Sequence, residues 1–237
     1  DYTPPAGVTT IGYGAFAASN LTRITLPEGV TSLGMYAFFR CPNLIAVNLP
    51  LTLTRLPSQS FYELPVLPGV HLPAGLAVFE PDAFFGCGAI TAYTVAAGNT
   101  SFTAVDGVLF NRTLTALVQA PAARTGSYVI PAGVTRVEPS AFRGCRGLTA
   151  ISIPASVDTI GVLSFGNVIA ALTVDPANPF FCSAEDVIYT RDKTQLVQVS
   201  QRRTGALVIP SGVTVLRPDR KSTRLNSSHV ALSRMPS

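Results

Sequence analysis

A repeat of 23 residues constrains this chain more than any other feature. The pair Leu26-Pro27 recurs as Leu49-Pro50 and as Leu72-Pro73. Aromatic residues follow each pair at the same spacing: Phe38, Phe61 and Phe84. Apolar pieces this short cannot close a core alone, so each repeat must stack on copies of itself. The sequence therefore predicts an elongated solenoid.

The unit itself favours short strands. Ile24 and Leu26 alternate with polar neighbours, which is the period of a strand with one buried face. Pro27 lacks an N–H donor and ends that strand. The segment that follows, around Phe38, is too short for a free-standing helix, and we interpret it as one helical turn with its ring inside the coil. The predicted fold class is a β-rich solenoid of the α/β type, with short parallel strands and single helical turns.

Two coils are longer than the others. The spacing from Val95 to the next position in phase, Ile130, is 35 residues. The added residues hold two alternating stretches on either side of a polar turn at residues 111–113, a pattern typical of a β-hairpin. The same insertion returns 79 residues later. Hairpin-bearing coils are therefore expected at about residues 95–129 and 174–208.

The repeat pattern fails near the C-terminus. The next interior aromatic is due at a position occupied by Lys221. Residues 219–229 back-translate to a widely used short-read sequencing adapter. We therefore expect residues 1–218 to form the solenoid and residues 219–237 to be an adapter-derived, disordered artefact.

Two motifs carry a family resemblance. The stretches Leu21-Thr-Arg-Ile-Thr-Leu-Pro-Glu-Gly-Val-Thr-Ser-Leu-Gly34 and Ala141-Phe-Arg-Gly-Cys145-Arg-Gly-Leu-Thr-Ala-Ile-Ser-Ile-Pro154 resemble the 23-residue leucine-rich repeats of BspA-like bacterial surface proteins. The hairpin motif Asp106-Gly-Val-Leu-Phe-Asn111 resembles a variant repeat of that family. The resemblance covers about residues 5–217. It implies a right-handed leucine-rich-repeat array in a secreted or surface-attached protein, some relatives of which are adhesins.

The charge of the chain does not indicate nucleic-acid binding. The formal net charge is +4, but four basic residues and one acidic residue lie after position 218, which leaves the solenoid at +1. No run reaches the roughly 18 apolar residues of a membrane span. The first residues also lack the basic and then apolar character of a secretion signal, so the expected location, extracellular or at the cell surface, comes from the resemblance.

The cysteines are predicted to be unpaired. Cys41, Cys87 and Cys145 share one repeat phase, and no two adjacent coils both carry one. Two coils are roughly 10 Å apart at about 4.8 Å per strand step, beyond the roughly 7 Å reach of a disulfide. Cys182 lies in the second insertion without a matching partner. We expect buried thiols that pack as small apolar groups.

The sequence points to no catalytic or metal site. Asp106, Glu185 and Asp186 are carboxylates, but they fall where the hairpins turn, and Asp106-Gly107 is an ordinary turn signal. A zinc site needs clustered ligands, and His71 is the sole histidine before the tail. We therefore expect no enzyme, no cofactor and no metal.

The outward side of the predicted strands is the candidate binding surface. Solenoids often bind partners on the face formed by stacked strands. Arg23, Asn48 and His71 are the most plausible polar contacts there, although a merely solvated strand face is also compatible with them.

The leading hypothesis is a non-catalytic scaffold for macromolecular recognition on a bacterial cell surface, with adhesion to a protein of a host or neighbouring cell. The alternative is a structural spacer that presents another domain.

Overall fold

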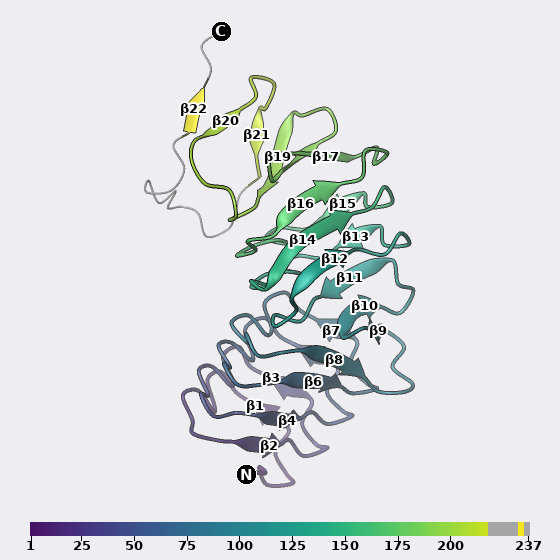
Figure 1. Cartoon of the computed structure of the whole chain (residues 1–237). Coiled ribbons are helices and arrows are strands. Elements are labelled where there is room, and N and C mark those ends of the chain that lie inside the picture. Colours follow the sequence, from purple (N-terminus) through teal and green to yellow (C-terminus); the bar gives the residue numbers. More distant parts are fainter. Residues whose placement is uncertain (218–231, 235–237) are drawn as a thin grey trace.

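The computed structural model describes residues 1–217 and 232–234. The chain winds as an elongated stack of coils, with the N-terminus at one end and the last coils at the other (Figure 1). The predicted tail at residues 219–237 lies mostly outside the described residues. Its three described residues form β22 (Leu232–Arg234), which pairs in parallel with β20 (Leu207–Ile209).

One strand of each coil joins a parallel stack, which we call the main strand file (Figure 1). The pairing follows the repeat: Ile24 lies opposite Val47, and Val70 lies opposite Tyr93. Besides β20 and β22, the main strand file comprises β2 (Arg23–Thr25), β4 (Ala46–Asn48), β6 (Gly69–Leu72), β8 (Ala92–Val95), β12 (Gly126–Val129), β14 (Leu148–Ile153) and β16 (Ala171–Val174).

A second file of two-residue strands runs along another side of the stack. Its members also pair in parallel, as Thr10 does with Ser32 and Arg136 with Thr159. The second strand file comprises β1 (Thr10–Ile11), β3 (Ser32–Leu33), β5 (Arg55–Leu56), β7 (Val78–Phe79), β13 (Arg136–Val137), β15 (Thr159–Ile160) and β21 (Val215–Leu216).

Two prolines interrupt these files. In the second file the Gly34 N–H donates to the Ile11 carbonyl of the coil before (N···O 2.7 Å). One repeat later the same position is Pro57, which has no N–H to donate. In the main strand file the Ile45 N–H donates to the Thr22 carbonyl (N···O 2.9 Å), and one repeat later this position is Pro68. As a consequence β3 and β5, like β4 and β6, belong to separate sheets.

The predicted single helical turns are wrong, since no described residue is helical. The N–H groups of Phe38 and Arg40 donate to the carbonyls of Ser60 and Tyr62 in the next coil, at 2.9 and 3.0 Å. Tyr36 and Arg40 have φ angles of 58° and 54°, in the left-handed region. The segment is a run of tight turns whose alternate N–H groups point along the stack, so they cannot close helical hydrogen bonds.

The predicted interior column of phenylalanines is confirmed. The rings of Phe38 and Phe61 stack with centroids 4.9 Å apart and planes 6° apart, and Phe61 stacks on Phe84 at 4.9 Å and 8°. Phe16 extends the column at 5.3 Å. Beyond the first insertion, Phe142 and Phe165 stack in the same way, at 5.4 Å.

Both predicted hairpins are confirmed, and each carries one strand more than expected. The β10–β11 hairpin is preceded by β9, which pairs antiparallel with β10, and the β18–β19 hairpin is preceded by β17. The six strands are β9 (Phe102–Val105), β10 (Val108–Asn111), β11 (Ala116–Gln119), β17 (Phe181–Ala184), β18 (Val187–Thr190) and β19 (Gln195–Val199).

The hairpin strands divide the core. On β10, Leu109 faces the N-terminal core cluster, whereas Val108 and Phe110 face the central one. On β18, Ile188 faces the central cluster, whereas Val187 faces a third, C-terminal cluster. Each hairpin is therefore a partition with two buried faces, and this accounts for the near absence of polar residues on its middle strand.

A buried asparagine begins each insertion. Asn99 occupies the phase of Leu76, and its Nδ2 donates to the carbonyls of Pro73 and Leu76 at 2.8 and 3.0 Å. Its Oδ1 accepts from the N–H groups of Ser101 and Phe102 at 2.9 and 2.7 Å. All four hydrogen-bonding sites of the amide are therefore occupied, and they hold the backbone where it leaves the regular coil.

A buried ion pair joins the coils on either side of the first insertion. Arg143 Nη1 lies 2.5 Å from Asp82 Oδ2, and the two side chains are 7% and 18% exposed. The Arg143 guanidinium also lies over the Phe85 ring, 3.9 Å from its centroid. Arg143 and Asp82 are 61 positions apart in sequence, so the contact joins the coils before and after the inserted hairpin.

Replacement of the central column ring should show its contribution to stability. We expect Phe61→Ala to lower the free energy of unfolding by about 3–5 kcal/mol, because it leaves a cavity between two stacked rings. Phe61→Leu, which keeps most of the apolar volume, should cost clearly less. Urea unfolding followed by circular dichroism measures both, and equal losses would contradict a stacked column.

The ion pair at the first insertion should also be detectable in unfolding. Arg143→Ala leaves the Asp82 carboxylate without its cation, so we expect a loss of about 3–5 kcal/mol. Arg55→Ala breaks the exposed pair with Glu80 and should cost about 1 kcal/mol or less. A similar loss in both variants would show that the Asp82 contact is no more than a surface pair.

Candidate interaction surface

The outward side chains of the main strand file lie along one side of the stack, on a surface that we call the strand face. Arg23 lies on β2, Asn48 on β4 and His71 on β6, and all three are exposed. The structure thus places the three predicted contact residues on one face in successive coils. Whether they bind a partner remains a prediction.

Hydrogen bonds between coils orient two of these side chains. Asn48 Nδ2 donates to Thr25 Oγ1 one coil earlier, at 3.1 Å. His71 Nδ1 and Thr94 Oγ1, one coil later, are 2.9 Å apart. A side chain held in this way loses less freedom when a partner binds. The strand face therefore offers partly ordered polar groups.

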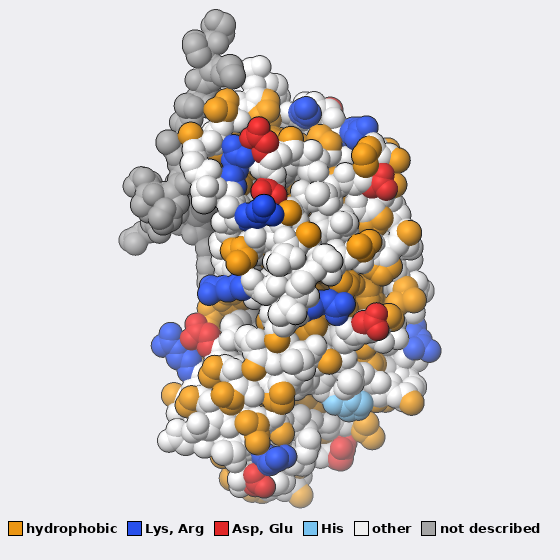
Figure 2. All heavy atoms as spheres, viewed as in Figure 1, with side chains coloured by type: hydrophobic (Ala, Val, Ile, Leu, Met, Phe, Trp, Pro, Cys, Tyr) orange, Lys and Arg blue, Asp and Glu red, His pale blue; other side chains and the backbone are white. Residues whose placement is uncertain are grey.

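The remainder of the strand face is small and weakly charged. Ala46, Gly69 and Ala92 occupy the position two residues before the polar ones. Val129 and Val208 add apolar surface, with exposed fractions of 67% and 44%. Figure 2 shows scattered single charges on this side of the molecule and no large patch of one sign. Such a surface suits contact with a protein better than with a polyanion.

A second surface, which is partly exposed, was not predicted from the sequence. A row of aromatic side chains runs along the turns and makes ring contacts from coil to coil: Tyr13, Tyr36, Phe39, Tyr62 and Phe85. Contacting centroids lie 5.3–6.1 Å apart. Tyr13 is 75% exposed, whereas the other four residues are half-buried.

The sequence did contain a signal for this aromatic row. A second aromatic residue follows the interior ring in three successive coils, in the doublets Phe38-Phe39, Phe61-Tyr62 and Phe84-Phe85. Neighbours on a tight turn point to different sides, so the second ring of each doublet must lie outside the coil. Aromatic side chains are enriched at protein interfaces, which makes the row a further candidate contact surface.

The thiols are unpaired, as predicted. Cys41 and Cys87 are buried, and their Sγ atoms donate to the carbonyls of Phe16 and Phe61 in the preceding coil, at 3.0 and 2.9 Å. Burial raises the pKa of the Cys87 thiol to about 12, and it raises the pKa of Cys145 to the same value. Since the thiolate is the nucleophile, these side chains are suited to packing and not to covalent chemistry.

The carboxylates of the hairpins lie in turns. Asp106 and Glu185 stand at equivalent positions with φ angles of 49°, and each backbone carbonyl accepts a hydrogen bond from an arginine. Arg124 Nη1 lies 2.9 Å from the Asp106 oxygen, and Arg203 Nη1 lies 2.9 Å from the Glu185 oxygen. The interpretation of these residues as turn formers agrees with their position.

Two searches of the described residues concern metals and membranes. In residues 1–217 and 232–234, no group of three or more His, Cys, Asp or Glu side chains is placed to hold a metal ion. Within the same residues, no helix has the length and hydropathy needed to cross a bilayer.

Comparison with protein families gives the identity of the repeat. The model of the BspA-type leucine-rich repeat region matches residues 1–113 and 123–178, in six copies. The chain belongs to this family. The predicted family resemblance is therefore confirmed, and with it the leucine-rich-repeat fold class. Among curated proteins no match is found.

Solved structures of bacterial leucine-rich repeat proteins have the same fold. A leucine-rich cell-surface protein of Faecalibacterium prausnitzii A2-165 is 28% identical, with a TM-score of 0.65 over 89% of this chain. The pneumococcal vaccine antigen PcpA is 20% identical and superposes with a TM-score of 0.68 over 88% of this chain. A leucine-rich repeat protein of Eubacterium ventriosum ATCC 27560 is 21% identical and superposes with a TM-score of 0.59 over 90% of this chain. The chain spans 54%, 50% and 55% of these three structures.

Alkylation should distinguish the thiols. At about pH 8 we expect iodoacetamide to modify the half-buried Cys182 first, whereas Cys87 and Cys145 stay unmodified until the protein is denatured. Their raised pKa leaves only about one thiolate in ten thousand at that pH, and burial blocks the reagent. Peptide mass spectrometry with and without urea measures this, and fast labelling of Cys87 in the folded protein would contradict the packing described.

Proposed function

We propose that this BspA-type chain is a non-catalytic scaffold of a bacterial cell-surface protein and that it binds another protein through the strand face. The observation that carries the proposal is the presence of Arg23, Asn48 and His71 on one face in three successive coils. Asn48 and His71 share one repeat position and are oriented by hydrogen bonds, and Arg23 lies at the position two residues earlier in the repeat. The family, and the cell-surface protein that is 28% identical, support the location.

Adhesion to a protein of a host or a neighbouring cell is the specific role that we infer. A stack of coils offers a contact surface much longer than any single coil, so many weak contacts can add up along it. The mixture of small apolar and uncharged polar groups suits a protein partner, since such interfaces are only about as apolar as other protein surfaces.

One observation favours a structural spacer as the second candidate. The strand face carries few charges and many small side chains, which is the composition of a surface that needs only to remain solvated. A spacer would hold another domain away from the cell without binding at this face.

A binding assay separates the two roles. We expect the purified chain to bind at least one member of a panel of immobilised extracellular-matrix proteins and whole bacterial cells, measured by biolayer interferometry. The triple variant Arg23→Ala, Asn48→Ala and His71→Ala should weaken that binding about tenfold or more, because contact residues at an interface centre carry most of the binding free energy.

The matched control places substitutions of exposed basic residues in the hairpin turns. Arg112→Ala combined with Lys193→Ala should leave binding unchanged, and thermal melting should show that both variants are folded. Undiminished binding by the triple variant would refute the strand face as the site, and failure to bind any panel member would favour the spacer.

A further inference from the structure

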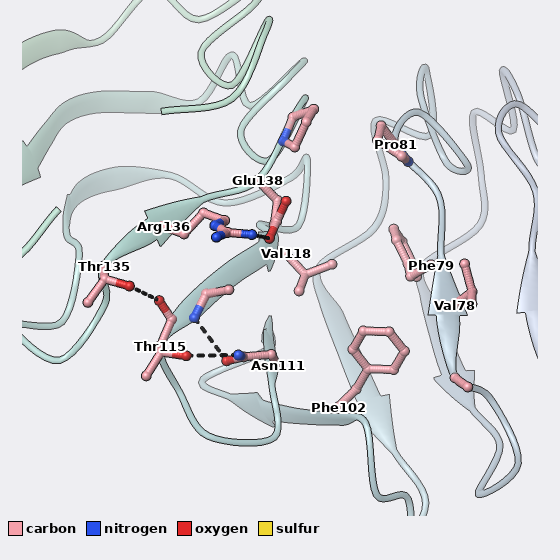
Figure 3. A pocket seen from close by; sticks show the side chains of 13 residues that line it. Val78, Phe79, Pro81, Phe102, Asn111, Thr115, Val118, Thr135, Arg136 and Glu138 are labelled. Carbon is pink, nitrogen blue, oxygen red and sulfur yellow. Dashed lines mark hydrogen bonds and ion pairs between the residues drawn. The ribbon is translucent and has the colours of Figure 1, made fainter. Parts of the chain in front are cut away.

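A groove opens where the first insertion interrupts the second strand file (Figure 3). It has a volume of about 470 Å³ and lies between β7 on one side and β11 and β13 on the other. The apolar lining comes from Val78, Phe79, Phe102 and Val118. Glu138 lies across the groove from β7, next to β13. The second edge of β7 pairs with no strand of the described residues, because β11 of the hairpin pairs with β10 and β13 instead.

Phe79, which lines the groove, carries a backbone acceptor that is paired in other coils. In the second strand file, the Leu56 carbonyl accepts from the Glu80 N–H of the next coil at 3.0 Å, and the Val137 carbonyl accepts from the Gly161 N–H at 2.8 Å. Phe79 is the residue one repeat after Leu56. Its carbonyl accepts no hydrogen bond from residues 1–217 or 232–234.

The chain contains a second copy of this junction, and there the acceptor is filled. The residue that corresponds to Phe79 beside the second insertion is Ile160 on β15. Arg217 reaches across the gap, and its Nη1 donates to the Ile160 carbonyl oxygen at 3.2 Å. Its Nε donates to Gln195 Oε1 at 3.3 Å. A guanidinium thus replaces the missing N–H of the next coil.

The first junction has the opposite chemistry at the same positions. Glu138 lies 79 residues before Arg217, and Ala116 lies 79 residues before Gln195. A carboxylate and a small side chain therefore stand where the second junction has an arginine and its partner. The position that closes the second junction therefore leaves the first one open, with a carboxylate on its wall.

Among the described residues, Arg136 is the cation that pairs with Glu138. Its Nη1 lies 3.9 Å from Glu138 Oε1, and the two side chains are 58% and 31% exposed (Figure 3). A pair this long and exposed contributes little. The Glu138 carboxylate also has a second oxygen, and a carboxylate can accept from more than one donor at once. It therefore remains available to a guanidinium from outside.

We propose that this groove binds an arginine side chain presented by an extended segment of a partner polypeptide. The guanidinium donates to the Phe79 carbonyl and to the Glu138 carboxylate, as Arg217 donates to Ile160 and Gln195. The methylene stem of the arginine packs against Phe102 and Val118. The partner backbone runs beside the unpaired edge of β7, in the manner of an added strand.

The planar guanidinium suits two acceptors better than an ammonium group does, because it carries five N–H donors in a fixed arrangement. The site lies on the second strand file and not on the strand face. It therefore adds a binding function that does not depend on the role proposed for Arg23, Asn48 and His71.

A peptide probe tests the assignment with the intact chain. The probe is a short, fluorescein-labelled β-hairpin peptide, cyclised by a disulfide, with valine and threonine strands and one arginine on its free edge. The matched peptide has citrulline in place of arginine, which keeps the shape and removes the charge. Fluorescence polarisation should show binding of the arginine peptide that is about tenfold or more tighter than that of the citrulline peptide.

Three variants locate the site. Glu138→Arg gives the first junction the residue of the second, so it should fill the groove and abolish binding. Glu138→Gln keeps the shape without the charge and should weaken binding about fivefold or more. Glu63→Gln removes a distant carboxylate that pairs with Arg40 and should bind as the unmodified chain does. Thermal melting verifies that each variant is folded.

Two sets of results would overturn the proposal. Equal binding of the arginine and citrulline peptides, or unchanged binding by Glu138→Arg, would show that the groove does not recognise a guanidinium. Self-association of the unmodified chain that Glu138→Arg abolishes, measured by light scattering without peptide, would assign the groove to a second copy of this chain.

Discussion

Each coil of this chain depends on backbone hydrogen bonds and ring contacts supplied by the coil beside it. The N–H groups of Phe38 and Arg40 have their acceptors one coil away, and the Phe38 ring is covered by Phe16 and Phe61. A coil separated from its neighbours would lose both, so stability resides between coils and not within them. Any departure from the 23-residue spacing must therefore be compensated where it occurs.

The two insertions show how that compensation is made. Asn99 supplies four hydrogen bonds where the backbone leaves the regular coil, and the hairpin covers the exposed ends of two cores with its two apolar faces. The Arg143–Asp82 pair restores contact between the coils on either side. One gap in the second strand file is closed by Arg217, whereas the corresponding gap beside Phe79 is left open.

Features that follow from spacing could be predicted from the sequence, and features that follow from backbone conformation or distant contacts could not. The repeat period located the phenylalanine column, the strand face and both hairpins. The turns around Phe38 were mistaken for helix, because no local pattern indicates that Tyr36 and Arg40 adopt positive φ angles. The Arg143 contact joins residues from different coils across an irregular insertion. The groove could likewise not be predicted from the sequence, since its lining residues come from separate coils that meet beside the hairpin.

The partitioning of the core has a mechanical consequence. Because the hairpins at β9–β11 and β17–β19 stand between the core clusters, the apolar interior is divided into three separate compartments and is not one continuous core. Tension applied along a repeat array opens the weakest segment first and proceeds only as far as the next strong boundary. Rupture of one compartment leaves the others closed, so a rod of this design yields in steps and retains ordered surface while part of it is extended.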